Sequence, residues 1–298
     1  MKIHIKNGRL IDPKNGIDAV QDIFIAKGKI VAIGTAPDEF QASRVIDAQS
    51  LVVCPGLVDL SVRLREPGLE YMATLESEMA AAVAGGVTSI ACPPDTDPPL
   101  DEPGLVEMLK HRAKSLNQAN VYPIGALTQG LKGERLTEMA ELNDAGCVVF
   151  GQPDGLLPNL RVLMQAMLYA STFGFSVWLR PQEITLTGDG VAHDGEVATR
   201  LGLLTVPVCA ETIAIGNIIL LTKETGVRVH LCRISSAEGL AMIRSARQQG
   251  LPITCDVSIN HLHLSDMDIG FFDSNCHLMP PLRSSSDRDA LRHGLLDG

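Results

Sequence analysis

Three arginines and one serine stand where predicted strands end, and their chemistry is that of anion binding and ion pairing. Ser61 and Arg63 lie two residues apart near the end of a short strand, so both side chains point to the same face. Arg180 and Arg233 each follow a further apolar strand. A guanidinium group stays protonated and has no lone pair, so it cannot bind a metal cation. These residue types predict positive charge, and not metal ligands, at the places where the strands end.

Arginines that end strands at one mouth need anionic partners, because an unpaired buried charge is costly. The candidate carboxylates are Asp59, Glu66, Asp95, Asp154 and Glu183. We favour an internal network of ion pairs that fills the mouth. The alternative is that the mouth binds a small anion.

The elements that must position these side chains alternate between strand and helix after Pro55. The predicted strands are Val87–Cys92, Val121–Leu127, Val148–Phe150, Ser176–Leu179, Val229–Leu231 and Ile253–Val257. Helical apolar spacing marks Leu75–Ala84, Leu160–Ala170 and Glu238–Arg247. Apolar strands separated by helices indicate a parallel sheet that is buried on both faces. The α/β pattern predicts a (β/α)8 TIM-type barrel with its site at the carboxyl ends of the strands, and a doubly wound open sheet is the alternative.

The first part of the chain has a different pattern. Residues 1–54 alternate polar and apolar side chains in short runs. Asn7-Gly8, Asn15-Gly16 and Lys27-Gly28 mark turns between these runs. We therefore expect a small β module over 1–54 and the barrel over 55–298.

The composition excludes several classes of function. The chain has 298 residues and a formal net charge of -10, which argues against a nucleic-acid partner. No apolar run reaches the ~18–20 residues that a membrane helix needs, so we expect no membrane association. The first residues lack the apolar core of a signal peptide, and the seven cysteines are scattered without a Cys-x-x-Cys pair. We expect a cytoplasmic protein with reduced thiols.

Several longer strings resemble the dihydroorotases of the amidohydrolase superfamily. They occur in the family's order along nearly the whole chain. The matching strings are Pro55–Gly68, Ala84–Cys92, Gly125–Gly133, His261-Leu262, Pro280–Arg283 and Asp287–Leu291. The resemblance implies a barrel plus a small β-sandwich to which both ends of the chain contribute. It also implies that the barrel is incomplete at the carboxyl end of this sequence.

The resemblance also implies a catalytic centre that this chain lacks. In the family, two metal ions at the barrel mouth activate a hydroxide that attacks the ring amide of dihydroorotate. The histidine pair of the first strand corresponds to Ser61 and Arg63, and the histidines of the fifth and sixth strands correspond to Arg180 and Arg233. The bridging acidic position lies near Asp154. With four imidazoles replaced, we expect no metal, no cofactor and no catalytic residue.

Two positions correspond to the family's substrate contacts. Arg65 matches the arginine that grips the substrate carboxylate, whereas Asp95 replaces an asparagine and would repel an anion. We regard both as vestigial substrate-binding residues. His261 and His263 form a His-x-His pair that could border a metal, but we favour satisfied loop histidines. His230 is expected to be a core or strand-end histidine.

The favoured function is that of a non-catalytic dihydroorotase-like protein. The resemblance implies that such members act in de novo pyrimidine biosynthesis as structural partners of aspartate carbamoyltransferase, and we expect an oligomer. One alternative is an active or weakly active dihydroorotase, or a relative that acts on another cyclic amide through relocated ligands. A small-anion binding protein is the other alternative.

Overall fold

The computed structural model describes residues 1–153 and 159–296, so Asp154 lies outside the described residues. The chain divides into two units. One consists of Met1–Val58 with Gly86–Thr88, and the other of Asp59–Gly85 with Ser89–Gly298. Each unit is built from its own pattern of side chains.

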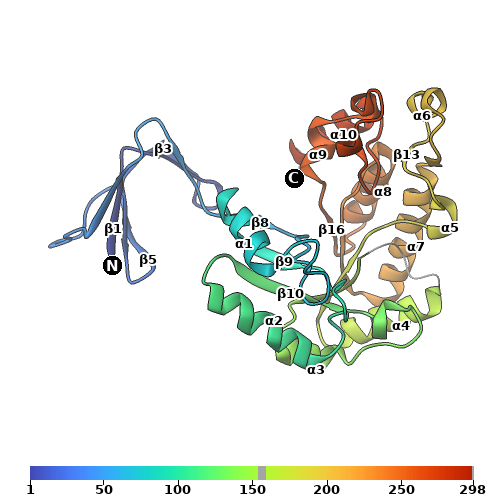
Figure 1. The fold of residues 1–298 in the computed structure, drawn as a ribbon, viewed down its shortest axis with the longest axis horizontal. Helices are drawn as coiled ribbons and strands as arrows, with labels where there is room; N and C mark the ends of the chain where they lie inside the picture. Colours follow the sequence, from blue (N-terminus) through green and yellow to red (C-terminus); the bar gives the residue numbers. More distant parts are fainter. Residues whose placement is uncertain (154–158, 297–298) are drawn as a thin grey trace. The chain divides into compact units, whose positions relative to one another are not determined.

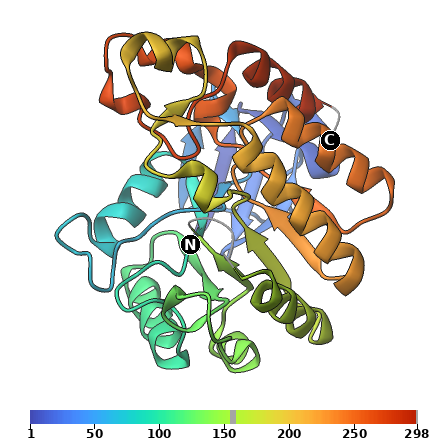
Figure 2. The same cartoon turned by 90° about the vertical axis from the view of Figure 1, so that its right-hand side faces the viewer.

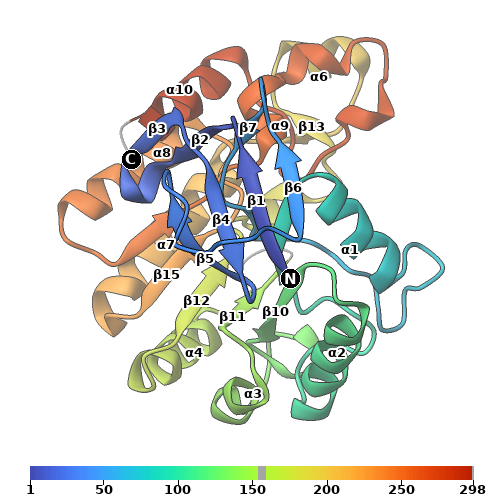
Figure 3. The ribbon, with the colours of Figure 1, turned by 90° about the vertical axis from the view of Figure 1, so that its left-hand side faces the viewer.

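The first unit is made of two small sheets. One has the order β5-β4-β1-β6 and the other the order β3-β2-β7 (Figure 3). The strands are β1 (Lys2–Lys6), β2 (Arg9–Asp12), β3 (Ile17–Val20), β4 (Ile23–Ala26), β5 (Lys29–Ile33), β6 (Arg44–Asp47) and β7 (Val52–Val53). The predicted turn at Lys27-Gly28 joins the antiparallel pair β4 and β5. Phe24 is buried and stacks on the ring of His4 at 4.5 Å between centroids, which fixes one face of the first sheet.

A curled sheet of seven strands forms the described part of the barrel wall. Its order is β16-β15-β12-β11-β10-β9-β8, and the pairs from β9 to β16 are parallel. The strands are β8 (Leu57–Asp59), β9 (Val87–Cys92), β10 (Asn120–Ala126), β11 (Val149–Gln152), β12 (Ser176–Leu179), β15 (Arg228–Leu231) and β16 (Ile253–Cys255). The predicted α/β barrel class is confirmed, and the described strands form about half a barrel (Figures 1 and 2).

Helices follow the strands and lie on the outer face of the curled sheet (Figure 2). They are α1 (Leu75–Ala84), α2 (Pro103–Leu116), α3 (Met139–Ala145), α4 (Leu160–Thr172), α7 (Cys209–Thr225), α8 (Ala237–Gln248) and α10 (Ser285–Leu296). A capping box between Thr74 and Ser77 starts α1. Leu163 and Met167 lie one turn apart and are fully buried, so α4 presents an apolar stripe to its neighbours. None of the described helices has the length and apolar character that crossing a bilayer requires.

Short elements extend beyond the carboxyl ends of the later strands. They are η2 (Gln129–Leu131), α5 (Ile184–Thr187), β13 (Ala192–His193), α6 (Glu196–Leu201), β14 (Thr205–Val206), α9 (Ile259–His263), η3 (Asp266–Ile269) and η4 (Ser274–Cys276). A separate apolar cluster that includes Ala192, Val197, Ile269 and Leu282 holds several of these segments together. The parallel pairing of β13 with β14 was not predicted from the sequence.

Candidate functional site

Ser61, Arg63, Arg180 and Arg233 all line one cavity of about 30 Å³. It lies past the carboxyl ends of β8, β12 and β15, where the barrel pattern predicts a site. Ligand pockets usually measure roughly 300–1,000 Å³, whereas a cavity needs only about 10–15 Å³ to hold one water molecule. The structure therefore brings the four predicted residues together around a small space, with room for about two water molecules. We call this space the arginine cavity.

The backbone explains why Ser61 and Arg63 both face the cavity. The amide of Val62 donates to the carbonyl of Ala91 at 2.9 Å, so the extended pairing continues past the end of β8. Residues 61 and 63 then share the face opposite to residue 62. Asp59 is fixed beside them, because its carboxylate accepts the amide of Ser61 at 2.9 Å.

Arg63 forms the clearest ion pair of the arginine cavity. Its Nε donates to Oδ2 of Asp95 at 2.5 Å, and the two side chains are only 27% and 18% exposed. Two other candidate carboxylates have partners elsewhere. Glu66 pairs with Arg112, and Glu183 caps the start of α5 by accepting the amide of Thr185 at 3.3 Å. Among the described candidate carboxylates, Asp95 is thus the one that forms an ion pair with Arg63.

The other two arginines contact carbonyl oxygens. Nε of Arg180 and one terminal nitrogen of Arg233 both donate to the carbonyl of Pro153, at 3.3 and 3.4 Å. A second terminal nitrogen of Arg233 donates to the carbonyl of Met279 at 3.3 Å. Arg180 is buried at 6% exposure, while Arg233 has a left-handed backbone with φ of 54°. These contacts hold both guanidinium groups across the mouth.

Arg65, the expected grip on a substrate carboxylate, lies apart from the arginine cavity. It is half-buried with φ of 61° and is not among the described residues that line the cavity. Asp95 does not line it either, but touches it through Arg63. Neither of the two predicted substrate contacts lines the cavity itself, and Asp95 reaches it only through its ion pair with Arg63.

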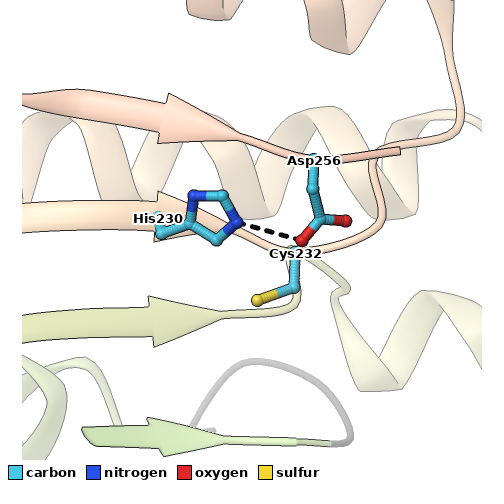
Figure 4. Close-up of side chains that lie close together, drawn as sticks. All are labelled: His230, Cys232 and Asp256. Atoms are coloured by element: carbon cyan, nitrogen blue, oxygen red, sulfur yellow. Dashed lines mark hydrogen bonds and ion pairs between the residues drawn. The ribbon is translucent and has the colours of Figure 1, made fainter. Parts of the chain in front are cut away.

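Three potential metal ligands come together at the edge of the arginine cavity, which Cys232 also lines. Atoms of His230, Cys232 and Asp256 lie within 4.8 Å of one another, and all three residues are half-buried. Nε2 of His230 lies 2.9 Å from Oδ2 of Asp256 (Figure 4). Burial raises the pKa of the Cys232 thiol to about 12. Sequence reasoning missed this group, although His-x-Cys on one strand followed by Asp at the end of the next strand was a usable signal.

The His261 and His263 pair is not brought together as a ligand edge. Both residues lie on the short helix α9, where His261 is buried and His263 is exposed. Nε2 of His261 lies 3.2 Å from the carbonyl of Pro281. Burial lowers the pKa of His261, so the neutral ring is favoured. The expectation of satisfied loop histidines holds only in part, because the segment is a helix and Nδ1 of His261 is buried without a hydrogen-bond partner.

A buried polar network lies behind the carboxyl end of β15, and it too was missed. The carboxylate of Glu211, near the start of α7, accepts four hydrogen bonds from Ser235 and Ser236: two from their amides and two from their hydroxyls. Arg283 donates from Nε to the hydroxyl of Ser235 at 3.1 Å. All four residues are at most 3% exposed. A glutamate inside an apolar helix was the sequence signal, because a buried carboxylate requires donors.

The side chains of the arginine cavity do not fit the two-metal centre that the family resemblance implies. A guanidinium group cannot ligate a cation, and three such groups add positive charge where the ions would bind. The only oxygen donor among the four replaced positions is the hydroxyl of Ser61. No hydrolytic step can be derived from these residues.

Comparison with known proteins gives one consistent result. The family model for dihydro-orotase-like proteins matches residues 50–239. A dihydroorotase-like protein of Pseudomonas putida is 47% identical over all 298 residues, which is 70% of that protein, and a dihydroorotase of Citrifermentans bemidjiense is 39% identical with the same coverage. The L-hydantoinase of Arthrobacter aurescens superposes with a TM-score of 0.84 at 25% identity, covering 99% of this chain and 67% of that one.

Proposed function

This chain belongs to the dihydroorotase-like family, and we propose that it is a member without hydrolase activity. One observation carries the proposal. The four positions that correspond to histidine ligands hold Ser61, Arg63, Arg180 and Arg233, and all four meet around one cavity of about 30 Å³. If only one histidine ligand were replaced, a neighbouring side chain could bind the metal in its place. Because all four histidine positions are replaced around the same cavity, the two metal ions of the family lose these ligands together.

The proposed role of the chain is structural. Inactive members of the family, as the resemblance implies, act in pyrimidine synthesis as partners of aspartate carbamoyltransferase. A barrel that serves as a docking surface needs its scaffold but not its metal centre. The buried network around Glu211 and the ion pair between Arg63 and Asp95 are consistent with that need, because both stabilise the strand ends without a metal.

Hydrolase activity is tested by incubating the purified protein with zinc and measuring dihydroorotate hydrolysis and its reverse, ring closure. We expect no turnover above the uncatalysed background, while an active dihydroorotase assayed alongside sets the scale. Turnover that disappears on chelation would favour the alternative that the protein is an active dihydroorotase. The 39% identity to a dihydroorotase is the observation that supports this alternative.

The partner role needs a separate experiment. We expect co-expression with the aspartate carbamoyltransferase chain to give one large complex on size exclusion. The Arg63→Ala variant should enter the complex equally well, since docking does not require the arginine cavity. Separate elution at micromolar concentrations would overturn the partner role and leave the absence of hydrolysis intact.

Small-anion binding is a second candidate, favoured by three guanidinium groups and one hydroxyl around the same cavity. Phosphate, carbamoyl phosphate and dihydroorotate are suitable probes. A ligand at 100 times its Kd stabilises a protein by about 2.7 kcal/mol, which raises the melting temperature measurably. An unchanged melting temperature at millimolar ligand would remove this candidate.

A further inference from the structure

We propose that His230, Cys232 and Asp256 form a binding site for one divalent cation of the zinc type. The site is distinct from the family's two-metal centre, because none of the three residues occupies a position that corresponds to one of its ligands. Among the residues that the structure describes, this is the one group of three metal-ligating side chains that converge.

Strand register brings the three ligands together. His230 pairs with Thr254 and Leu231 with Cys255 in the parallel ladder of β15 and β16. His230 and Cys232 are two residues apart and share one face, and Thr254 and Asp256 share the corresponding face of the neighbouring strand. The amide of Cys232 donates to the carbonyl of Leu179 at 2.8 Å, which keeps the chain extended past the end of β15.

Neighbouring groups already orient two of the ligands. Nδ1 of His230 lies 2.8 Å from the hydroxyl of Thr254, so an Nδ1–H can donate there and leave the lone pair of Nε2 for a cation. The amide of Arg233 donates to Oδ1 of Asp256 at 2.7 Å, which leaves Oδ2 turned toward the imidazole. Such outer hydrogen bonds fix the tautomer and direction of metal ligands.

The ligand set is one that zinc accepts. Imidazole, thiolate and carboxylate together make three protein ligands, and water can fill the fourth tetrahedral position. Binding displaces the thiol proton of Cys232 to solvent and forms the metal–sulfur bond. With one thiolate and one carboxylate the loaded site is neutral, and this limits repulsion from the nearby Arg180 and Arg233.

Cobalt(II) titration tests the proposal without reference to activity. The protein is stripped with a chelator, kept reduced and titrated with Co²⁺. We expect a thiolate-to-cobalt charge-transfer band in the near ultraviolet that saturates at one ion per chain and disappears when Zn²⁺ is added. Cys232→Ser should abolish the band. The matched control Cys255→Ser should keep it, because Cys255 points to the opposite face of β16.

Two further variants keep the test decisive if Cys232→Ser folds poorly. Asp256→Asn should weaken cobalt binding at least tenfold, and Thr254→Val, which removes only an orienting hydrogen bond, should weaken it by about 10–100-fold. Absence of the band at one equivalent of cobalt would overturn the proposal. A band that survives Cys232→Ser would also overturn it, because the thiolate would then belong to another cysteine.

Discussion

Two clusters of charged groups near the carboxyl end of the sheet differ in how they are held. In the network around Glu211, one carboxylate accepts four hydrogen bonds, and Arg283 closes the arrangement with every member almost fully buried. In the arginine cavity, Arg63 and Asp95 remain partly exposed, and the other arginines contact backbone carbonyls. The difference teaches that the network around Glu211 is satisfied within the fold, whereas the first ion pair of the arginine cavity keeps contact with solvent.

Removing the carboxylate at the centre of the network should have the largest effect. Glu211→Ala removes one of the anionic neighbours of the buried Arg283 and leaves two serine amides without acceptors. We expect a loss of about 3–5 kcal/mol in the free energy of unfolding, measured with denaturant. Glu238→Ala on the exposed face of α8 is the matched control, with an expected loss within about 0.5 kcal/mol. A loss below about 1 kcal/mol for Glu211→Ala would erase the contrast between the two clusters.

The ion pair of the arginine cavity should contribute less. A double-mutant cycle with Arg63→Ala and Asp95→Ala is expected to give a coupling of about 1 kcal/mol, because the pair is partly exposed and well aligned. The pair of Arg9 with Asp18 is more exposed, at 56% and 55%, and serves as the control that should couple more weakly. A coupling equal to the effect at Glu211 would mean that the cavity is as important to the fold as the network is.

Protonation of the histidines beside the Glu211 network should lower the stability of the fold. Burial lowers the pKa of His193 and His261, and the ring of His193 contacts Arg283. Because the unfolded chain binds these protons more readily, stability is complete above pH ~6.5 and falls as the pH drops toward the folded-state values. His261→Gln should reduce the slope of melting temperature against pH between about 7 and 5. His263→Gln, on the exposed side of α9, should leave that slope unchanged.

The fold and the arginine cavity could be predicted because both rest on local patterns. Ser176–Leu179 is a short, mostly apolar strand followed by Arg180, so the barrel rule placed this residue at a strand end, and the family resemblance singled it out as a site residue. The pairing of His230 with Asp256 depends on which strands are neighbours and in what register, which a single sequence does not contain. The partners of Glu211 lie 24 and 25 residues away and follow from tertiary packing alone.

Joint loss of metal-binding chemistry at Ser61, Arg63, Arg180 and Arg233 is the central proposal for this protein. Its most direct test is dihydroorotate hydrolysis by the zinc-loaded protein, with metal content measured in the same sample. We predict no turnover above background, whether or not one ion is bound at His230, Cys232 and Asp256. Turnover that chelation abolishes and zinc restores would contradict the account.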